Sequence, residues 1–413
     1  MLEHLQYCLE EQSEKITSWY KAKVKSLKEE NISLPLFSSF DMRDSGYKAS
    51  IVDSNVYPSG FNNLDLESQL YASKRFSNYL SSLSIEKDIL IISENHTRNT
   101  FYFDNIHVLS SILNRAGFDT YFGYIEGKNN SHPTLILEKY EKPLKIEKLF
   151  RDNGRVYTDS FHDGIIILNN DLSVNHPEIL DNIHQHVLPS ISLGWYNRKK
   201  STHFKLFNML IEELASIVPF DPWLLKTSFT YVDDINFKDK DSLDDVAKAV
   251  DLVISEISLK YEELDIREDP FVFVKNNSGT YGLGIICVSS GEEIKNLNSK
   301  KRKKMIYGKD RSRIDSVLIQ EGIYSNYLIH DNPAEPVLYN VGGEVVGGFM
   351  RVNKLQDRDK NLNTRGMTFQ KLVTNNQTRP IILKNGEFSL YALLTKIADL
   401  AISYEYKQTL TDK

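Results

Sequence analysis

Cysteine is almost absent from this sequence of 413 residues, which contains only Cys8 and Cys287. A secreted domain held together by disulfides, or a cysteine-rich zinc module, needs more cysteines and is therefore excluded. So few thiols fit a reducing compartment, and we expect a cytoplasmic protein. Both cysteines are expected to pack against neighbours, Cys8 in the first helix and Cys287 in an apolar strand, rather than to act as nucleophiles.

Long apolar runs and an excess of one charge are also missing. No stretch of roughly 18 apolar residues occurs, so we expect no membrane-spanning helix. Glu3, Glu10 and Glu11 interrupt the N-terminal segment, unlike the continuous apolar core of a signal peptide. The 50 basic and 56 acidic residues give a formal net charge of −6, which does not suit a broad nucleic-acid-binding surface. Membranes and nucleic acids are therefore not expected partners.

Several familiar catalytic motifs are missing as well. H-E-x-x-H, G-x-S-x-G and G-x-x-x-x-G-K-[ST] do not occur. His184 and His186 are two residues apart, so on a helix they would face different sides and make a poor zinc pair. The sequence therefore offers no obvious protein nucleophile, zinc site or P-loop.

The hydrophobic pattern predicts an α/β N-terminal half. With an apolar share of 41%, a packed core is expected, and at roughly 150 residues per domain the length allows two or three domains. The first 30 residues predict an amphipathic helix, and residues 41–65 lack a period and are interpreted as a long ordered loop. Strands and a helix then predict a βαβ unit: a strand at 88–93, a helix at 105–116, a strand at 118–125 and a further strand at 163–171.

The second half changes character near residues 190–200, where we place the domain boundary. Two helices are expected there, each followed by apolar strands, and the strands VLYNV and EVVGGFMRV are expected to form a hairpin. The expected elements are helices at 202–217 and 241–262, strands at 271–275, 285–289 and 316–322, the hairpin at 337–352, and a helix at 388–405.

The sharpest local signal is a strand that ends in Lys275 and leads into a glycine-rich loop, followed by another strand. Three glycines within six residues let backbone N–H groups approach an anion, so this loop suits a flap over a triphosphate. An ordinary glycine-rich hairpin turn is the alternative. The residues concerned are Lys275, Ser278, Gly279, Gly282 and Gly284.

Three further segments carry candidate residues, each of which could instead be a plain surface or strand-end residue. The strand end Gln320-Glu321-Gly322-Ile323 can present backbone groups to an adenine edge, with a carboxylate near the ribose. Arg351 can neutralise a transferring phosphoryl group. The oxygens of Glu335, Asn361 and Asn363 suit Mg²⁺.

Two basic clusters remain open to interpretation. The segment Arg198 to Phe204 opens a helix, where basic residues are unfavourable unless an anion offsets them. A solvated basic patch is the alternative. The run from Lys300 to Lys304 lies on an expected helix and fits a solvated face or a phosphate rim better than a nucleic-acid site.

Taken in order, these segments resemble the proteobacterial type of glutamate–cysteine ligase that carries an ATP-grasp fold. The resemblance covers roughly residues 40–370. It rests on DSNVYPSGFNNL, SENHTRNTFYFDN, LNNDLS, GWYNRKKSTHF, FDPWLL, VKNNSGTYGLGI, IQEG, AEPVLYNVGGEVVGGFMRVN and NLNTRGM. It implies an α/β (α+β) chain with an N-terminal domain at 1–195, similar to a pre-ATP-grasp domain, and an ATP-grasp domain at 196–413.

The activity that the resemblance implies is the first step of glutathione biosynthesis. ATP would activate the γ-carboxylate of glutamate as an acyl phosphate, which the amine of cysteine then attacks. Glutamate, cysteine and ATP are the expected small-molecule partners, with Mg²⁺, or alternatively Mn²⁺, as the metal. Another ATP-grasp ligase with different amino acids, or a non-catalytic nucleotide-binding protein, is the alternative.

Residue roles follow from the same resemblance. Lys275, Arg351 and Asn363 are expected to be catalytic, and Glu335, Asn361 and Asn363 are the metal candidates, since no clear E-x-N follows residue 367. The expected ATP contacts are Lys199, Lys200, Lys275, Ser278, Gly279, Gly282, Gly284, Gln320, Glu321 and Ile323. The expected amino-acid contacts are Arg43, Asp53, Asn55, Asn62, Asn63, Glu94, Asn95, Arg98 and Asn170, with loop-capping roles as the alternative.

Overall fold

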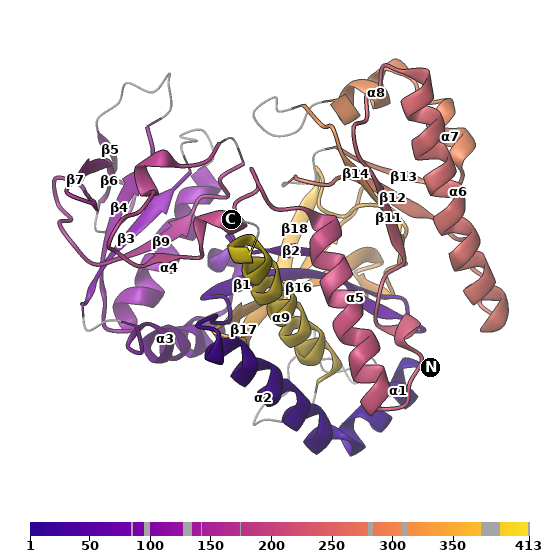
Figure 1. Cartoon of the computed structure of the whole chain (residues 1–413), viewed down its shortest axis with the longest axis horizontal. Helices are drawn as coiled ribbons and strands as arrows, with labels where there is room; N and C mark the ends of the chain where they lie inside the picture. The colour runs from indigo at the N-terminus through magenta and orange to yellow at the C-terminus, as the bar shows by residue number, and fades with distance from the viewer. Residues whose placement is uncertain are drawn as a thin grey trace.

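Three main sheets lie side by side in the protein and are joined by helices (Figure 1). The computed structural model describes residues 1–83, 86–94, 100–126, 134–141, 143–173, 175–279, 284–306, 313–372 and 389–411, with only the backbone of Thr100 and Lys304. The expected α/β class is confirmed. No helix of these ranges is long and apolar enough to cross a membrane.

The lobe on the left of Figure 1 is built on a mainly parallel sheet of order β10-β9-β3-β4-β6-β5, in which only β5 is antiparallel. The predicted βαβ unit is confirmed as β3, α4 and β4. The bounds are β3 (Asp88–Ser93), α4 (Thr100–Arg115), β4 (Asp119–Tyr124), β5 (Thr134–Leu137), β6 (Leu144–Lys148), β9 (Ile165–Asn169), β10 (Val187–Leu188) and a separate ribbon, β7 (Phe150–Asp152) with β8 (Arg155–Tyr157).

The central sheet joins the beginning of the chain to its last third. Its order is β18-β17-β16-β1-β2, with β15 also paired to β16, and the predicted hairpin is confirmed as β16 and β17. Strand β1 runs antiparallel to β16, and Phe37 lies opposite Val341. The bounds are β1 (Phe37–Asp44), β2 (Ala49–Asn55), β15 (Tyr327–Ile329), β16 (Asn332–Val341), β17 (Glu344–Asn353) and β18 (Met367–Lys371).

Two sequence-based expectations need revision here. The loop predicted at 41–65 was wrong over its first part, because residues 41–44 belong to β1 and residues 49–55 form β2. The polar side chains of Asp53 and Asn55 interrupt the apolar pattern by which a strand is recognised in a sequence. The predicted division into domains at residues 1–195 and 196–413 stays a prediction. Residues 37–55, from the first of these ranges, hydrogen-bond in one sheet with strands from the second.

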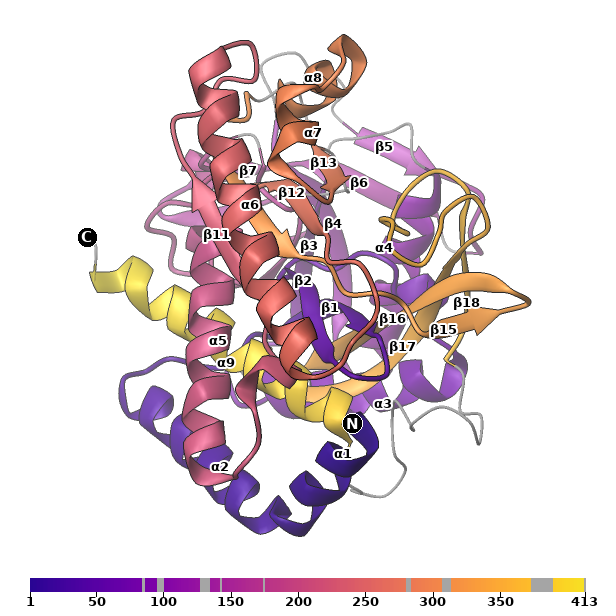
Figure 2. The same ribbon diagram turned by 90° about the vertical axis from the view of Figure 1, so that its right-hand side faces the viewer.

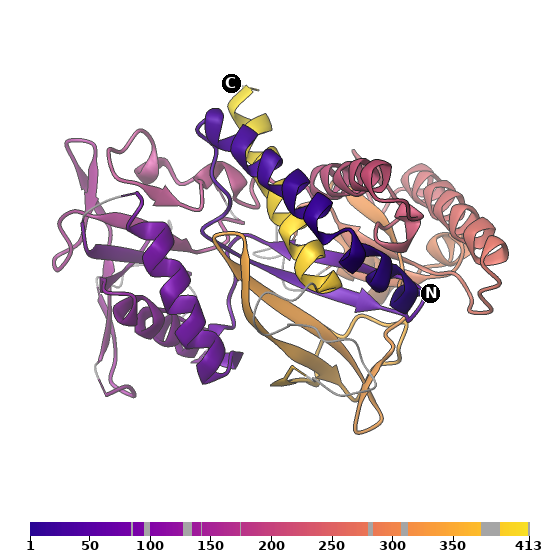
Figure 3. The ribbon, with the colours of Figure 1, turned by 90° about the horizontal axis from the view of Figure 1, so that it is seen from below.

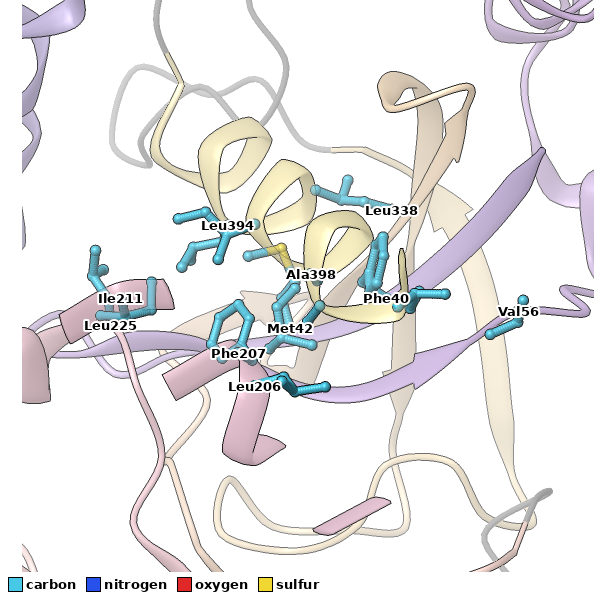
Figure 4. Close-up of a cluster of buried hydrophobic side chains, with 14 of the residues drawn as sticks. Phe40, Met42, Val56, Leu206, Phe207, Ile211, Leu225, Leu338, Leu394 and Ala398 are labelled. Atoms are coloured by element: carbon cyan, nitrogen blue, oxygen red, sulfur yellow. The ribbon is translucent and has the colours of Figure 1, made fainter. Parts of the chain in front are cut away.

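Helices cover both faces of the central sheet. Helices α9 and α5 pack on one face, α1 and α2 lie across them, and α3 packs on the other face (Figure 3). Side chains such as Phe40, Met42, Phe207 and Leu394 fill the space between α9, α5 and the strands (Figure 4). The single N-terminal helix that was expected is two, broken at Gln12. The bounds are α1 (Leu2–Glu11), α2 (Ser13–Glu29), α3 (Leu66–Leu80), α5 (Lys200–Ile217) and α9 (Leu390–Thr411).

The third sheet is antiparallel, with the order β11-β14-β12-β13, and α6 packs against it (Figure 2). Helix α6 follows the N-cap Asp239 and buries residues at helical spacing, such as Val246, Val250 and Ile257. The predicted strands on both sides of the glycine-rich loop are confirmed. The bounds are β11 (Phe229–Val232), α6 (Lys240–Glu263), β12 (Val272–Asn276), β13 (Ile285–Val288), α7 (Gly291–Lys295), α8 (Ser299–Ile306) and β14 (Val317–Glu321).

A buried ionic network ties α9 to β2 and to the segment that enters α5. Arg198 donates to Glu405 Oε2 at 2.7 Å and to the carbonyl of Ser54 at 2.8 Å, and His203 Nδ1 lies 2.5 Å from Glu405 Oε1. Burial alone would raise the pKa of Glu405, but Arg198 and His203 outweigh it and hold that pKa at about 2. The network therefore fixes the start of α5 against β2.

Glu405→Gln is expected to lower the free energy of unfolding by roughly 3 kcal/mol, because it leaves the Arg198 charge buried without a carboxylate. Urea denaturation at pH 7 measures this. Lys407→Met is the matched control on the same helix, because the side chains of its ion pair with Glu30 are 37% and 42% exposed, unlike the buried network. It should change stability by less than about 0.5 kcal/mol. Equal stabilities of the two variants would contradict the role of the network.

Candidate functional site

Charged side chains meet in a cleft between the central sheet and the β11–β14 sheet. The cleft has about 460 Å³ of empty space and opens to solvent. Six of the residues predicted from the sequence line it, together with Asp41, which was not predicted. The lining residues are Asp41, Arg43, Val52, Asp53, Phe273, Lys275, Ile285, Glu335, Asn361 and Asn363.

Two arginines and two carboxylates interlock on the central sheet. Arg351 lies opposite Glu335 in the β16–β17 pairing and donates to its Oε1 at 2.6 Å. Its two terminal nitrogens also donate to the two oxygens of Asp41, at 2.6 and 3.1 Å. Arg43 donates from Nε to Glu335 Oε2 at 2.5 Å, and to the carbonyl of Lys360 at 2.7 Å. The guanidinium of Arg351 is therefore held in a fixed orientation.

In the same network, the pKa values of the two carboxyl groups are shifted in opposite directions. Burial raises the pKa of Asp41, although Arg351 opposes this. Burial would also raise the pKa of Glu335, but Arg43 and Arg351 together outweigh it and lower that pKa. Glu335 is thus a firmly ionised link between two arginines, whereas Asp41 is the carboxyl group that is more easily protonated.

At the start of α5, Lys200 forms an ion pair with Asp53 of β2. Lys200 N donates to the carbonyl of Asn277 at 2.8 Å, and Ser201 N donates to Asn277 Oδ1 at 2.9 Å, so the helix begins against the end of β12. Asp53 therefore offsets the basic start of the helix in the structure, where an external anion had been expected. Of the two lysines predicted for ATP, Lys200 is the buried one and Lys199 the more exposed.

Lys275 differs from the other cations of the cleft because its partners are neutral. Its Nζ donates to Gln320 Oε1 at 2.7 Å and to the carbonyl of Val52 at 3.0 Å. No ion pair joins it to a carboxylate among the described residues. Burial lowers the pKa of Lys275 to about 8, although Asp53 opposes this. A positive charge held between neutral groups is well suited to an incoming anion.

The described part of the glycine-rich loop leads directly from Lys275. A Cβ atom on Gly279 would come within 2.7 Å of the Asn276 side-chain amide, and Gly284 has a φ of +65°, so both positions favour glycine. Ser278 N donates to Asn276 Oδ1 at 3.1 Å, which closes a tight turn. Gly282 lies outside the described residues.

Beyond Lys275, the predicted adenine segment, Gln320 to Ile323, spans the end of β14. The Gln320 side chain faces Lys275, whereas the Glu321 carboxylate is buried against Lys48 at 2.9 Å. A ribose contact from Glu321 would therefore have to come from its backbone. Gly322 N donates to the carbonyl of Phe271 at 2.8 Å, and Ile323 is buried.

Oxygen donors that suit a magnesium ion line the same cleft. Mg²⁺ is usually held by one or two carboxylates together with substrate phosphates, and Asn361 and Asn363 add amide oxygens near the three acidic residues of the cleft. Asn361 Oδ1 accepts from Asn363 N at 2.9 Å, while its buried Nδ2 has no hydrogen-bond partner among the described residues. Within the described ranges, no three His, Cys, Asp or Glu side chains form a ready metal site. The chemistry of the donors fits Mg²⁺ provided that phosphate oxygens complete the shell.

The comparison with protein-family models decides the family. The model described as glutamate–cysteine ligase (GshA) matches residues 6–406. This chain belongs to the glutamate–cysteine ligase family. The ligase activity expected from the sequence, which joins glutamate to cysteine in the first step of glutathione biosynthesis, is thereby confirmed.

A solved structure agrees with this assignment. A protein of Methylobacillus flagellatus, to which gamma-glutamylcysteine synthetase activity is provisionally assigned, superposes with a TM-score of 0.87 at 31% identity, covering 99% of this chain and 96% of that one. A glutathione synthetase-like effector from Globodera pallida reaches only a TM-score of 0.41 at 11% identity, over 89% and 84% of the two chains. The D-alanyl-alanine synthetase A of Vibrio cholerae reaches 0.32 at 9%, over 79% and 81%. No curated protein gives a significant match.

Most of the amino-acid contacts predicted for this ligase in its N-terminal half lie outside the cleft lining of the described chain. Asn55 Oδ1 accepts from Tyr57 N at 3.0 Å, and Glu94 Oε1 accepts from Asp171 N at 2.9 Å. Asn170 donates to the carbonyl of Ser93 at 3.0 Å. These are loop-capping contacts in the structure, and Asn62 and Asn63 lie in the short 3₁₀ helix Phe61–Asn63. Their substrate roles stay predictions, and Asn95 and Arg98 lie outside the described residues.

The ligase residue that sequence reasoning missed is Asp41. It lies on β1, next to Asp53 on β2 in the strand pairing, and faces the cleft with Arg43. The segment SFDMR (residues 39–43) alternates polar and apolar residues, as a half-buried strand does, and this signal could have identified Asp41.

The pKa of about 8 at Lys275 predicts how ATP use by this ligase depends on pH. The lysine is charged below this pKa and neutral above it, so a phosphate contact is lost as the pH rises. The KM for ATP should increase roughly fivefold between pH 8 and pH 9 if only the charged form binds. Initial rates at saturating glutamate and cysteine measure it, and a Lys275→Met variant, which has no such group, should show a flatter profile. Parallel profiles would contradict the assignment.

Proposed function

We propose that this glutamate–cysteine ligase binds the triphosphate of ATP and the reacting carboxylate of glutamate in the cleft between the two antiparallel sheets. The observation that supports the proposal is that Arg43 and Lys275 line one cleft, while Arg351 and Lys200 are paired with carboxylates that line it. Among the described residues that line the cleft, the carboxylates are Asp41, Asp53 and Glu335, which are three against these four cations. The remaining positive charge suits an anionic substrate.

The chemistry needs positioned charge rather than a protein nucleophile. The γ-carboxylate of glutamate attacks the γ-phosphorus of ATP, which releases ADP and leaves γ-glutamyl phosphate. The cysteine amine then attacks the activated carbonyl. The C–N bond forms, the bond between the carbonyl carbon and the phosphate oxygen breaks, and the amine loses a proton as phosphate leaves. Charge stabilisation and orientation are the main contributions that a protein makes to phosphoryl transfer.

Each cation has a distinct part in the proposal. Lys275, whose partners are neutral, contacts the ATP phosphates beneath the glycine-rich loop. Arg351, which Asp41 and Glu335 hold in place, stabilises the transferring phosphoryl group. Lys200 adds charge where α5 begins, and the backbone of Gln320 to Ile323 reads the adenine.

A magnesium ion would neutralise phosphate charge when bound. Glu335, Asn361 and Asn363 are the residues proposed to hold it, with the phosphates of ATP. Because both oxygens of Glu335 accept hydrogen bonds from arginines, the two amide side chains are the more accessible ligands. The proposed metal site also includes the neighbouring carboxylates of the cleft, Asp41 and Asp53.

The proposal is tested by ADP formation with glutamate fixed and each amino acid offered in turn as the acceptor, with and without Mg²⁺. Cysteine is expected to give the highest rate, and mass spectrometry should find γ-glutamylcysteine in amounts equal to the ADP formed. A different preferred acceptor would show that the enzyme joins another pair of substrates. No ADP with any pair of amino acids would refute the proposal.

A further inference from the structure

A buried lysine–glutamate pair lies at the end of β14, away from the residues that line the cleft. Lys48 Nζ is 2.9 Å from Glu321 Oε2, and their side chains are 1% and 0% exposed. The same ammonium lies 3.6 Å from the centre of the Trp223 ring. Glu321 Oε2 also accepts from Ser228 N at 2.8 Å.

Stability alone does not account for this pair. Burial lowers the pKa of Lys48 to about 8 and raises the pKa of Glu321, so each charge is held at a cost that its partner only partly offsets. The second carboxylate oxygen, Glu321 Oε1, is buried and has no hydrogen-bond partner in the described chain. Buried ion pairs of this kind are often replaced by apolar side chains without loss of stability.

The position of the pair relates it to the nucleotide. Lys48 lies in the turn between β1 and β2, and Glu321 directly precedes Gly322 and Ile323, the proposed adenine-binding segment. The turn contacts the chain after β14 at a second point, where Asn326 N donates to the carbonyl of Asp44 at 2.7 Å.

The β1–β2 hairpin also reaches the phosphate end of the cleft. It carries Asp41, Arg43 and Asp53, and the carbonyl of Val52 accepts from Lys275 Nζ at 3.0 Å. One hairpin therefore holds both the segment proposed for adenine and the lysine proposed for phosphate, so its contact with Glu321 sets the distance between the two ends of a bound nucleotide.

We propose that Lys48 and Glu321 form a positioning pair, which fixes the adenine-binding segment relative to the phosphate end of the cleft. The inference rests on the proposed function, since it takes ATP to lie along this cleft. The pair touches no substrate and acts through the backbone of residues 322 and 323. Losing it should weaken recognition of the purine while leaving recognition of the phosphates intact.

The experiment compares ATP with inorganic tripolyphosphate, which has the phosphates but no base. In the Lys48→Met/Glu321→Met double variant, no charge is left buried alone. The KM for ATP should rise roughly tenfold, as expected for the loss of well-placed adenine hydrogen bonds. Inhibition by tripolyphosphate and the KM for glutamate should stay within about twofold, and the thermal midpoint should not fall.

Two further variants sharpen the test. Glu321→Gln keeps an oxygen that can accept from Lys48 and Ser228, so its KM for ATP should rise clearly less than that of the double variant. Lys248→Met, on the exposed face of α6, is the control for the lysine-to-methionine change and should match wild type throughout. If the double variant fails to fold, Lys48→Leu/Glu321→Leu, which likewise leaves no charge and no hydrogen bond between the two positions, is measured in its place, and the same rise of roughly tenfold is expected.

The outcomes separate this inference from the proposed function. A folded double variant with wild-type KM for ATP, or with equal losses for ATP and tripolyphosphate, overturns the positioning role. If the wild-type chain binds ATP but does not join glutamate to cysteine, the proposed function fails while ATP dissociation constants still test the pair. If wild type binds tripolyphosphate as tightly as ATP, no adenine segment exists and the inference falls.

Discussion

Arg351→Ala is expected to lower kcat by roughly 10³-fold, while the KM for ATP changes by less than about fivefold. The reason is that the guanidinium matters most where charge develops as the phosphoryl group moves, and not in the ground state. Asp41 and Glu335 already hold the guanidinium in place before any substrate arrives, so little reorganisation is needed during the reaction. Steady-state kinetics with coupled ADP detection measure the two constants separately.

The control for this prediction must separate catalysis from folding. Removing Arg351 leaves Asp41 and Glu335 facing each other in a buried site, so the alanine variant is compared by thermal denaturation with Arg351→Lys, which keeps a charge. The lysine variant should fold like wild type and still lose roughly 10²-fold in kcat, because an ammonium cannot replace the planar fork. Arg267→Ala, whose side chain is exposed, is the neutral control. A kcat close to wild type in the folded lysine variant would remove Arg351 from the reaction.

The parts of the fold that the sequence predicted well are those with strong local patterns. Each of these elements can be recognised from a pattern within about 20 residues of chain. They are the long helix α6, the β16–β17 hairpin with its Gly-Gly turn, and the strands on both sides of the glycine-rich loop. For the same reason, Lys275 was correctly placed at the end of a strand. Lys275, Arg351 and the Asn361–Asn363 segment were then grouped by resemblance, and the structure places Lys275 and both asparagines along one cleft.

What the sequence could not give depends on contacts between distant parts of the chain. Strand β1 pairs with β16, roughly 300 residues later, and no local pattern encodes that register. Asp41 therefore looked like a loop residue, although it binds Arg351 in the structure. Strand β2 was missed because cleft-facing charge breaks its apolar alternation. Nothing in the sequence pointed to Lys48, because its partner, Glu321, lies 273 residues later in the chain.

Lys275→Met is expected to raise the KM for ATP by roughly 100-fold and to lower kcat as well. Methionine keeps the length and apolar stem of the side chain, so packing over the Phe273 ring is retained while the charge is lost. The described partners of Lys275 are a carbonyl and an amide oxygen, so phosphate does not have to displace a carboxylate to reach its charge. Lys200, by contrast, is already paired with Asp53. A charged hydrogen bond in such a site contributes roughly 1.5–3 kcal/mol, which is about 10- to 150-fold in affinity.

The matched control for this substitution is Lys25→Met on α2, whose ammonium is exposed and far along the chain from the cleft residues. Calorimetric titration with ATP and with ADP locates the lost contact. If Lys275 binds the terminal phosphates, ATP should lose more affinity than ADP, and the preference for ATP should shrink. If it serves only to hold Gln320 and β2 in place, both nucleotides should weaken equally and the thermal midpoint should fall with them. Because Gln320 and the Val52 carbonyl can still be satisfied by water once the ammonium is gone, the first outcome is the one that the geometry favours.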